Sequence, residues 1–408
     1  MRKITFALCL TISALSASAQ IDPELLRISA TDSVQNSMNM DAVYSRPFTS
    51  VGKLPVSVGG YLEANWQHFT TDGISDGHQF NFRRMTLFVS SAISSRIKFL
   101  SEIEFEDGGK EIAIEFAAVD VEFHKLANLR AGIIMNPIGA FNQNHDGPKW
   151  NFNERPISAT ELLPATWSNV GAGVYGKQYS NKWMLGYEVY FSGNFDDKVI
   201  DNEHNKTFLP ASKQNPERFE EINSGLPLLT AKIAARYAER IELGFSYMGG
   251  VYNKYRDDGL LIDRKRRLDV VAIDWNAKLS KLNTNIIGEW AWVFIDVPET
   301  YTQQYGSRQQ GGFVDFVQPL FSKNILGWVN ASLNVALRIE YVDWNKGRFR
   351  ETGGRIYEEA WSYSPALSFS PTSQTIFRIN YLSRRQKDIL GNPAAKTGGF
   401  SVGVATYF

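Results

Sequence analysis

The chain has 408 residues with 43 basic and 43 acidic side chains, so its formal net charge is zero. This balance argues against a dedicated nucleic-acid-binding protein, which would carry a basic excess. A single cysteine, Cys9, leaves no disulfide framework and no thiolate metal site, so the stability of the fold must come from burial and backbone pairing.

Residues 1–19 have the pattern of a secretory signal peptide. Arg2 and Lys3 precede a short apolar run, and small residues end at Ala19, which predicts cleavage before Gln20. Neither this run nor any later segment reaches the roughly 18 uninterrupted apolar residues that a membrane helix needs. The signal peptide holds two of the basic residues and none of the acidic ones, so the exported chain has a net charge of −2 and no cysteine. Residues 20–54 are polar and do not alternate, which predicts a periplasmic N-terminal segment.

Strict alternation of apolar and polar residues characterises the chain from residue 55 to residue 408. In RIKFLSEIEFE, residues 96–106, the even positions are mostly charged and the odd positions mostly apolar. Because successive side chains leave a strand on opposite faces, this period of two indicates a strand with one wet and one apolar face. We predict about sixteen strands, near residues 56–67, 80–91, 96–106, 117–124, 128–135, 170–177, 183–191, 227–238, 241–250, 268–279, 283–294, 312–320, 329–343, 357–369, 374–384 and 399–408.

The predicted connections alternate between short and long. Brief turns such as SAIS, KLA, AER, LSK and SPTS alternate with connections that include 137–169 and 192–226. Short turns on one side and long loops on the other are typical of a barrel in the bacterial outer membrane. A soluble sandwich has no reason to place its long loops at one end only.

The charged residues distinguish the two all-β alternatives, a soluble sandwich and an outer-membrane barrel. Charged residues recur on the wet faces of most strands, and a dry sandwich core would cost several kcal/mol for each unpaired ion. Aromatic residues make up 13% of the chain, and many lie at strand ends, as an aromatic girdle requires. The final Phe408 resembles the C-terminal signal of outer-membrane proteins. The predicted fold class is therefore all-β: a transmembrane antiparallel barrel of about sixteen strands, with short periplasmic turns and long extracellular loops.

Residues 80–180 resemble the phosphate-selective porin O and P family, especially its members in Bacteroidetes-type bacteria. The resemblance rests on Arg83 and Arg84, on the acidic stretch 102–108, and on the LR-x-G-x-x-x-x-P-x-G pattern over 129–139. It implies an outer-membrane porin of a Gram-negative bacterium, often a homotrimer, surrounded by lipid. It also implies that the third extracellular loop, 137–169, folds inward and narrows the pore.

The resemblance implies a set of residues at the pore constriction. Lys149 and Arg155 belong to the loop, and the neighbouring wall would supply the strand residues Arg84, Arg96, Lys98 and Arg130. Alternatively, Lys149 and Arg155 pair with Asp146 and Glu154 and only hold the loop in place. Glutamates 102, 104 and 106 share a face with Lys98, so we expect a mixed lumen that passes small polar or anionic solutes, phosphate among the candidates, with a modest preference for anions.

Other classes of function are also compatible with an outer-membrane barrel. An outer-membrane barrel enzyme such as a hydrolase, or a non-conducting structural or adhesive barrel, remains an alternative, whereas 408 residues leave no room for a plugged barrel of twenty-two strands. The G-x-S-x-G pattern around Ser401 lacks the following helix that a hydrolase needs. His68 and His78, and the acidic stretch 194–205, lack a regular ligand spacing. We therefore predict no enzyme activity, no cofactor, no bound metal and no nucleic-acid partner.

Overall fold

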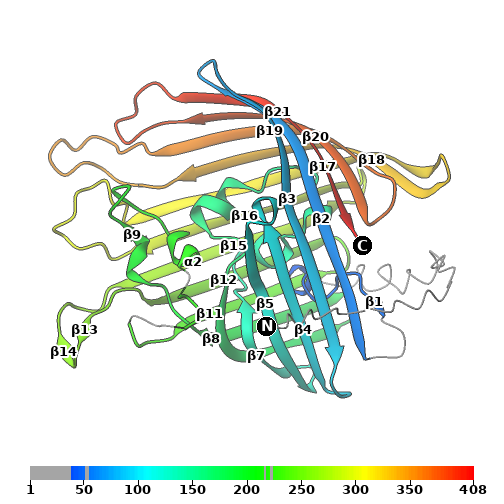
Figure 1. The fold of residues 1–408 in the computed structure, drawn as a ribbon, viewed down its shortest axis with the longest axis horizontal. Coiled ribbons are helices and arrows are strands. Elements are labelled where there is room, and N and C mark those ends of the chain that lie inside the picture. Colours follow the sequence, from blue (N-terminus) through cyan, green and yellow to red (C-terminus); the bar gives the residue numbers. More distant parts are fainter. Residues whose placement is uncertain (1–37, 51–54, 216, 221–223) are drawn as a thin grey trace, which may run out of the picture.

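Sixteen long strands form one closed antiparallel sheet in the computed structural model, which describes residues 38–50, 55–215, 217–220 and 224–408 (Figure 1). The predicted signal peptide lies outside the described residues. The barrel strands are β2 (Val56–Thr71), β3 (Ile74–Ala92), β4 (Ile97–Glu106), β5 (Glu111–His124), β6 (Ala127–Met135), β7 (Ser168–Ser180), β8 (Trp183–Ser192), β11 (Leu228–Tyr237), β12 (Ile241–Val251), β15 (Arg267–Leu279), β16 (Thr284–Ile295), β17 (Arg308–Ile325), β18 (Trp328–Asp343), β19 (Glu359–Ser370), β20 (Thr375–Gln386) and β21 (Ala395–Tyr407).

The barrel closes between its first and last long strands. β2 pairs with β21 from Tyr61 opposite Tyr407 to Thr71 opposite Thr397, so neither strand is left with a free edge along this ladder. The other neighbours in the sheet are consecutive in sequence, as hairpins require. The predicted barrel of about sixteen strands is therefore confirmed.

Most connections also alternate in length as predicted, although 72–73 and 107–110 are short connections at the long-loop end. Turns such as 125–126, 181–182 and 326–327 lie at one end of the barrel, and the long connections, including 136–167 and 193–227, start from the other end (Figure 1). Short elements occupy the long connections: β9 (Ile200–Asp201), β10 (Lys206–Thr207), β13 (Arg256–Asp257), β14 (Leu260–Leu261), α2 (Ala211–Gln214) and η7 (Asp197–Val199). Among the described residues, no helix has the length and apolar character to cross a bilayer.

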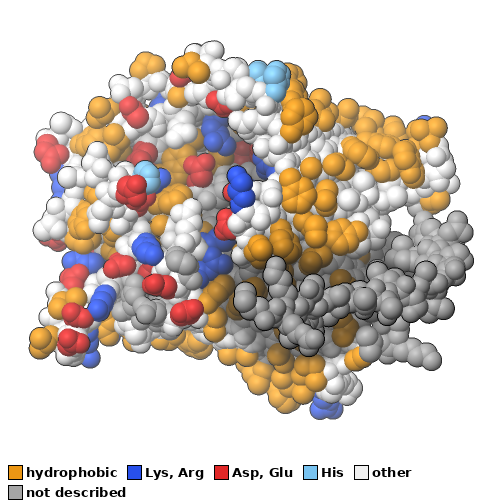
Figure 2. All heavy atoms as spheres, in the orientation of Figure 1, with side chains coloured by type: hydrophobic (Ala, Val, Ile, Leu, Met, Phe, Trp, Pro, Cys, Tyr) orange, Lys and Arg blue, Asp and Glu red, His pale blue; other side chains and the backbone are white. Residues whose placement is uncertain are grey.

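Apolar side chains cover the outside of the wall, and ionic side chains point inward. On β11, Ile233 is 62% exposed, whereas the adjacent Lys232 is 1% exposed. On β4, Glu102 and Glu104 are fully buried, while Ile97 and Ile103 remain partly exposed on the outer face. Figure 2 shows apolar side chains over the outer wall and charged ones gathered at the end with the long loops. This placement is the reverse of a soluble core, as the sequence predicted.

Candidate functional site

The long connection between β6 and β7, residues 136–167, runs inside the barrel. It contains three short helical turns, η4 (Asn142–Asn144), η5 (Gly147–Lys149) and the π-helical turn η6 (Ser158–Leu162). We call residues 136–167 the lumen loop. Its contacts reach wall residues on opposite sides of the barrel: Glu102 of β4, Glu188 of β8, Lys232 of β11, Glu289 of β16, Glu340 of β18, Arg378 of β20 and Tyr407 of β21.

Wall carboxylates accept hydrogen bonds from the backbone of the lumen loop. One oxygen of Glu289 accepts from the amides of Ala140 and Phe141 at 2.8 and 3.2 Å, and the other accepts from the Ser158 hydroxyl at 3.2 Å. Glu340 accepts from the Ile157 amide at 2.8 Å. A buried irregular segment has no ladder partners for its N–H groups, so these carboxylates satisfy them.

Wall cations do the same for the carbonyl groups of the loop. Arg378 donates to the carbonyl oxygens of Gly147, Trp150 and Phe152 at 3.1, 3.2 and 2.7 Å. Arg338 donates to the Glu154 carbonyl at 2.8 Å, and Lys232 donates to the Gly139 carbonyl at 2.7 Å. The inward charges therefore dock a loop, in addition to facing one another. This role was not predicted from the sequence, which indicated only that the charges need water.

An apolar cluster holds the other side of the loop. Ile138, Ile157 and Trp167 pack in one buried group with Val270 of β15 and Val293 of β16. Burying one valine or isoleucine side chain stabilises the folded state by about 1.5–3 kcal/mol. Here the inward face of the wall is apolar, because the loop rather than water covers it.

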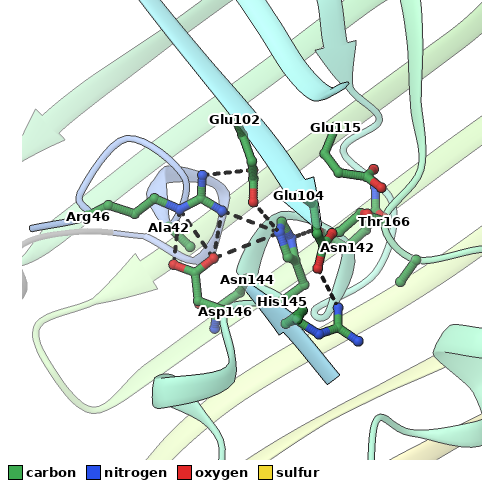
Figure 3. A network of polar contacts seen from close by, with 12 residues as sticks. Ala42, Arg46, Glu102, Glu104, Glu115, Asn142, Asn144, His145, Asp146 and Thr166 are labelled. Atoms are coloured by element: carbon green, nitrogen blue, oxygen red, sulfur yellow. Dashed lines mark hydrogen bonds and ion pairs between the residues drawn. The ribbon is translucent and has the colours of Figure 1, made fainter. Parts of the chain in front are cut away.

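A buried ionic network joins the lumen loop to residues upstream of the barrel (Figure 3). The guanidinium of Arg46 points between two carboxylates, donating to Glu102 at 2.8 Å and to Asp146 at 2.6 Å. His145 Nε2 lies 3.2 Å from Glu102 and 3.3 Å from an Arg46 nitrogen. Tyr407 donates its hydroxyl proton to Asp146 at 2.7 Å. The four ionic side chains at the centre of this network are completely screened from solvent.

Burial and neighbouring charges together shift the pKa values of the loop residues in this network. Burial opposes ionisation of Asp146, but the Arg46 guanidinium outweighs it and holds the pKa of Asp146 well below its usual range. Burial likewise opposes the charged form of His145, and the Glu102 carboxylate outweighs it, so the pKa of His145 is raised. Burial lowers the pKa of Lys149 despite its partner Asp146. The neighbouring charges therefore favour the ionised forms of Asp146 and His145, whereas burial disfavours the ionised form of Lys149.

Residues 38–48, the described part of the predicted N-terminal segment that precedes β1 (Thr49–Ser50), pack against inward-facing side chains of the barrel wall. Met38 and Met40 pack against Met184 and Ala234 of the wall. Val43 joins the inward-facing Leu100, Phe116, Ala118, Ile134 and Tyr190. Because this stretch is polar on average, its composition did not indicate that Met38, Met40 and Val43 would be buried against the lumen wall.

The structure brings together some of the predicted constriction residues. Arg84 contacts Glu63, Glu104 and Glu106 at 3.2, 2.8 and 3.1 Å, and the loop residue Arg155 lies 3.7 Å from the same Glu104. Lys149 pairs with Asp146 at 3.4 Å, as the holding alternative predicted, and also donates to the Ala42 carbonyl. Arg155 pairs with wall residue Glu104 and not with Glu154.

The other three predicted wall cations lie apart from this group. Arg130 is buried on β6, pairs with Asp120 at 2.7 Å and stacks on Tyr44 at 3.9 Å. Arg96 lies in the exposed turn between β3 and β4, outside the group of residues around Arg84. Lys98 faces the lumen only at the short-turn end, where it is half exposed and pairs with Glu122 at 2.7 Å. Alternation gives the face of a residue but not its height along the barrel.

Arg83 is a lumen residue that alternation alone assigns to the wrong face. The register of β2 and β3 shifts between Glu63 and Ala64, so Arg83 is left without a pairing partner, and consecutive arginines both reach inward. Arg83 donates to Asn65 at 3.0 Å and to the Asn153 carbonyl of the lumen loop at 2.9 Å. Two adjacent arginines in an otherwise alternating strand are the sequence signal from which a bulge could have been predicted.

The other motifs take structural roles in the described residues. Ser401 lies within β21 and accepts a hydrogen bond from Asn65 at 3.1 Å, so its motif has no strand–turn–helix geometry. His68 and His78 are cross-strand partners with stacked rings, their centroids 4.5 Å apart. In the acidic stretch 194–205, Asp196 caps η7 by accepting from the Lys198 amide. None of these arrangements provides a nucleophile–base pair.

The similarity of this chain to known proteins lies more in its fold than in its sequence. No protein-family model matches the chain. An uncharacterised protein of Aquifex aeolicus (strain VF5) is 29% identical over 211 residues, which cover 50% of this chain and 46% of that protein. The chain thus spans about half the length of the curated relative that it matches.

Several solved outer-membrane structures share the fold. OmpF of Salmonella typhi in complex with daunomycin aligns with a TM-score of 0.55 and 11% identity, over 88% of this chain and 99% of that one. The anion-selective porin of Comamonas acidovorans aligns at 0.54 and 11%, over 86% and 99% of the two chains. The channel DcaP of Acinetobacter baumannii aligns at 0.51 and 12%, over 86% and 97%. At these identities the likeness concerns the fold.

A closed barrel with an apolar exterior is stable only where hydrocarbon meets its outer wall. The exterior of this chain carries exposed large apolar side chains on strand after strand, among them Leu185, Ile233, Leu243, Phe377 and Val402. Together with the shared fold, this places the chain in the outer membrane of a Gram-negative bacterium.

Proposed function

We propose that this chain is a porin that lets small polar solutes diffuse through the outer membrane. The observation that carries the proposal is a closed barrel whose long third connection lies across the lumen, docked on ionic side chains of the wall. Such a loop reduces the cross-section available to a solute and sets a size limit, while the charges beside it set a preference. The porin fold of the solved structures supports this reading.

The finer proposal concerns the solute. Resemblance of residues 80–180 to the phosphate-selective porins supports small anions, with phosphate as a candidate. Each of Arg84, Lys98 and Arg130, however, contacts a carboxylate, so the fixed charges largely compensate one another. We therefore propose passage of small polar solutes in general with a modest preference for anions, which arises from Arg155 of the lumen loop, whose guanidinium lies farther from its carboxylate partner, 3.7 Å from Glu104. Homotrimeric assembly stays a prediction.

Single-channel recording in a planar bilayer tests the function. The purified protein is expected to give stepwise openings. In a potassium chloride gradient, the sign of the reversal potential should show that chloride passes somewhat more readily than potassium. Absence of openings, with the barrel shown to be folded, would contradict the porin.

A matched pair of variants tests the source of the preference. Arg155→Gln removes a cation of the lumen loop, so the reversal potential should move toward cation preference. Arg96→Gln removes the same charge from the exposed turn and should leave the potential unchanged. Equal shifts in the two variants would refute the assignment to Arg155. Phosphate is tested as a solute by adding it during chloride conduction. If phosphate enters the pore, the chloride current should fall.

A further inference from the structure

The N-terminal residues 38–48 fill one mouth of the lumen. We call residues 38–48 the inner segment. They precede β1 (Thr49–Ser50), which pairs with β2 at Val58 and Ser57 and so ties the segment to the wall. The segment lies toward the short-turn end, because Met40 packs beside Gly186, close to the start of β8. The lumen loop contacts it from the inner side, through Lys149 on the Ala42 carbonyl and Asn39 on the Ala140 carbonyl.

One patch of the wall beneath the inner segment is apolar, which is unusual for the lumen of a water-filled pore. Leu100, Phe116, Ala118 and Ile134 face inward here, and Val43 covers them. Without the segment these side chains would meet water, at a cost of about 25 cal/mol for each Å² of apolar surface. This patch of the wall is therefore stabilised by the apolar part of the inner segment that covers it.

Ionic contacts hold the inner segment at several points of the wall. Arg46 donates to Glu102 and Asp146, and its guanidinium stacks on the Phe88 ring at 4.0 Å. Tyr44 lies over the Arg130 guanidinium at 3.9 Å. Asp41 forms an ion pair with Lys177, and the Asn39 amide donates to Glu242 at 2.7 Å. These partners belong to β3, β4, β6, β7 and β12, so the segment spans much of the circumference.

Taking the proposed porin function as given, we propose that the inner segment is a plug that limits conduction at the short-turn mouth. A solute that passes the lumen loop would meet the inner segment next. Space remains beside it, since a cavity of about 540 Å³ lies between the segment, the lumen loop and wall residues such as Arg236 and Gln374. The conductance of the native protein is then set by the segment together with the lumen loop.

Two variants test the plug by conductance. In the first, a Gly/Ser linker of equal length replaces residues 38–48, which removes the side chains and keeps the connection to β1. In the second, Arg46→Glu places a third carboxylate between Glu102 and Asp146, so repulsion should release the segment. The linker variant should conduct at least about twofold more than the native protein, and Arg46→Glu should show intermittent openings to that level. Arg350→Glu makes the same charge change at an exposed loop position and should have native conductance.

Chemical labelling gives a readout that does not depend on conduction. Ala42 is buried under the lumen loop, so a cysteine placed there (Ala42→Cys) should resist a water-soluble maleimide in the native background and react in the Arg46→Glu background. The chain without the added cysteine reports any background from Cys9. Heat-modifiable migration on a gel shows that each variant keeps its barrel.

The outcomes of these experiments distinguish failure of the plug proposal from failure of the porin proposal. If the native protein and the linker variant conduct equally, the plug is overturned and the porin stands. If cysteine at position 42 reacts readily in the native background, the plug is likewise overturned. If neither protein conducts, the porin fails, and protection of position 42 that is lost in Arg46→Glu still supports a sealed mouth.

Discussion

Arg378 is the wall residue whose loss should loosen the lumen loop most clearly. Its guanidinium donates to the carbonyl oxygens of Gly147, Trp150 and Phe152, and it pairs with Glu63 at 2.8 Å. Arg378→Met keeps much of the length and apolar bulk of the side chain but removes all four interactions. Three buried carbonyl groups then lose a donor, while Glu63 retains Arg84 at 3.2 Å.

The expected magnitude follows from these contacts. Removing one partner from a buried ionic cluster costs about 3–5 kcal/mol, and the remaining Arg84 places this case near the lower figure. A loss of about 3 kcal/mol raises the ratio of undocked to docked loop roughly a hundredfold. The stretch 147–152 should therefore leave the wall far more often, although the closed sheet of β2 to β21 stays paired.

Single-channel recording and limited proteolysis measure this effect. Arg378→Met should show added fluctuations between conductance levels and faster cleavage within the lumen loop. Arg385→Met is the matched control, because Arg385 is an exposed residue of the same strand, β20, outside the loop contacts. If Arg378→Met has native dwell times and a native cleavage pattern, the docking role of the wall cations is refuted.

Two further predictions concern the wall and the ionic network. Ile233→Arg places a charge on the lipid-facing side of β11 and should destabilise the inserted barrel by about 2–4 kcal/mol, measured by unfolding in lipid vesicles, whereas a native unfolding curve would refute the outward assignment. His145 has a raised pKa because Glu102 outweighs its burial, so its contribution to stability is complete below about pH 6.5 and is lost as the pH rises through the raised value. The thermal-stability gap between the native protein and His145→Gln should therefore narrow above about pH 6.5, and a gap that widens would contradict the charged form of the ring.

Much of the wall follows from local patterns. Alternation placed Glu102 and Glu104 inside and Ile103 outside, and the alternating connection lengths indicated which end carries the long loops. These features are local because side chains of a strand point alternately to two faces, whatever lies beyond them. The same rule misplaced Arg83, since one bulge shifts the register by a residue.

The candidate site depended on contacts between distant parts of the chain. Lys149 and Asp146 are neighbours in sequence, and their pairing was among the predicted alternatives. The pairing of Arg46 with Glu102 joins residues 56 positions apart, and that of Arg378 with Glu63 joins residues 315 positions apart. No periodic pattern encodes such distances, because they arise only when the sheet closes.

The sequence by itself determined the two-faced strands, and hence a barrel with an apolar exterior, because each strand must match hydrocarbon on one side over its own length. Only the tertiary structure decided what fills the interior. Closing the sheet brings inward carboxylates and cations from opposite walls to within hydrogen-bond distance of an irregular loop, whose turns satisfy only part of its own backbone. The same closure creates an apolar patch in the lumen that residues 38–48 cover.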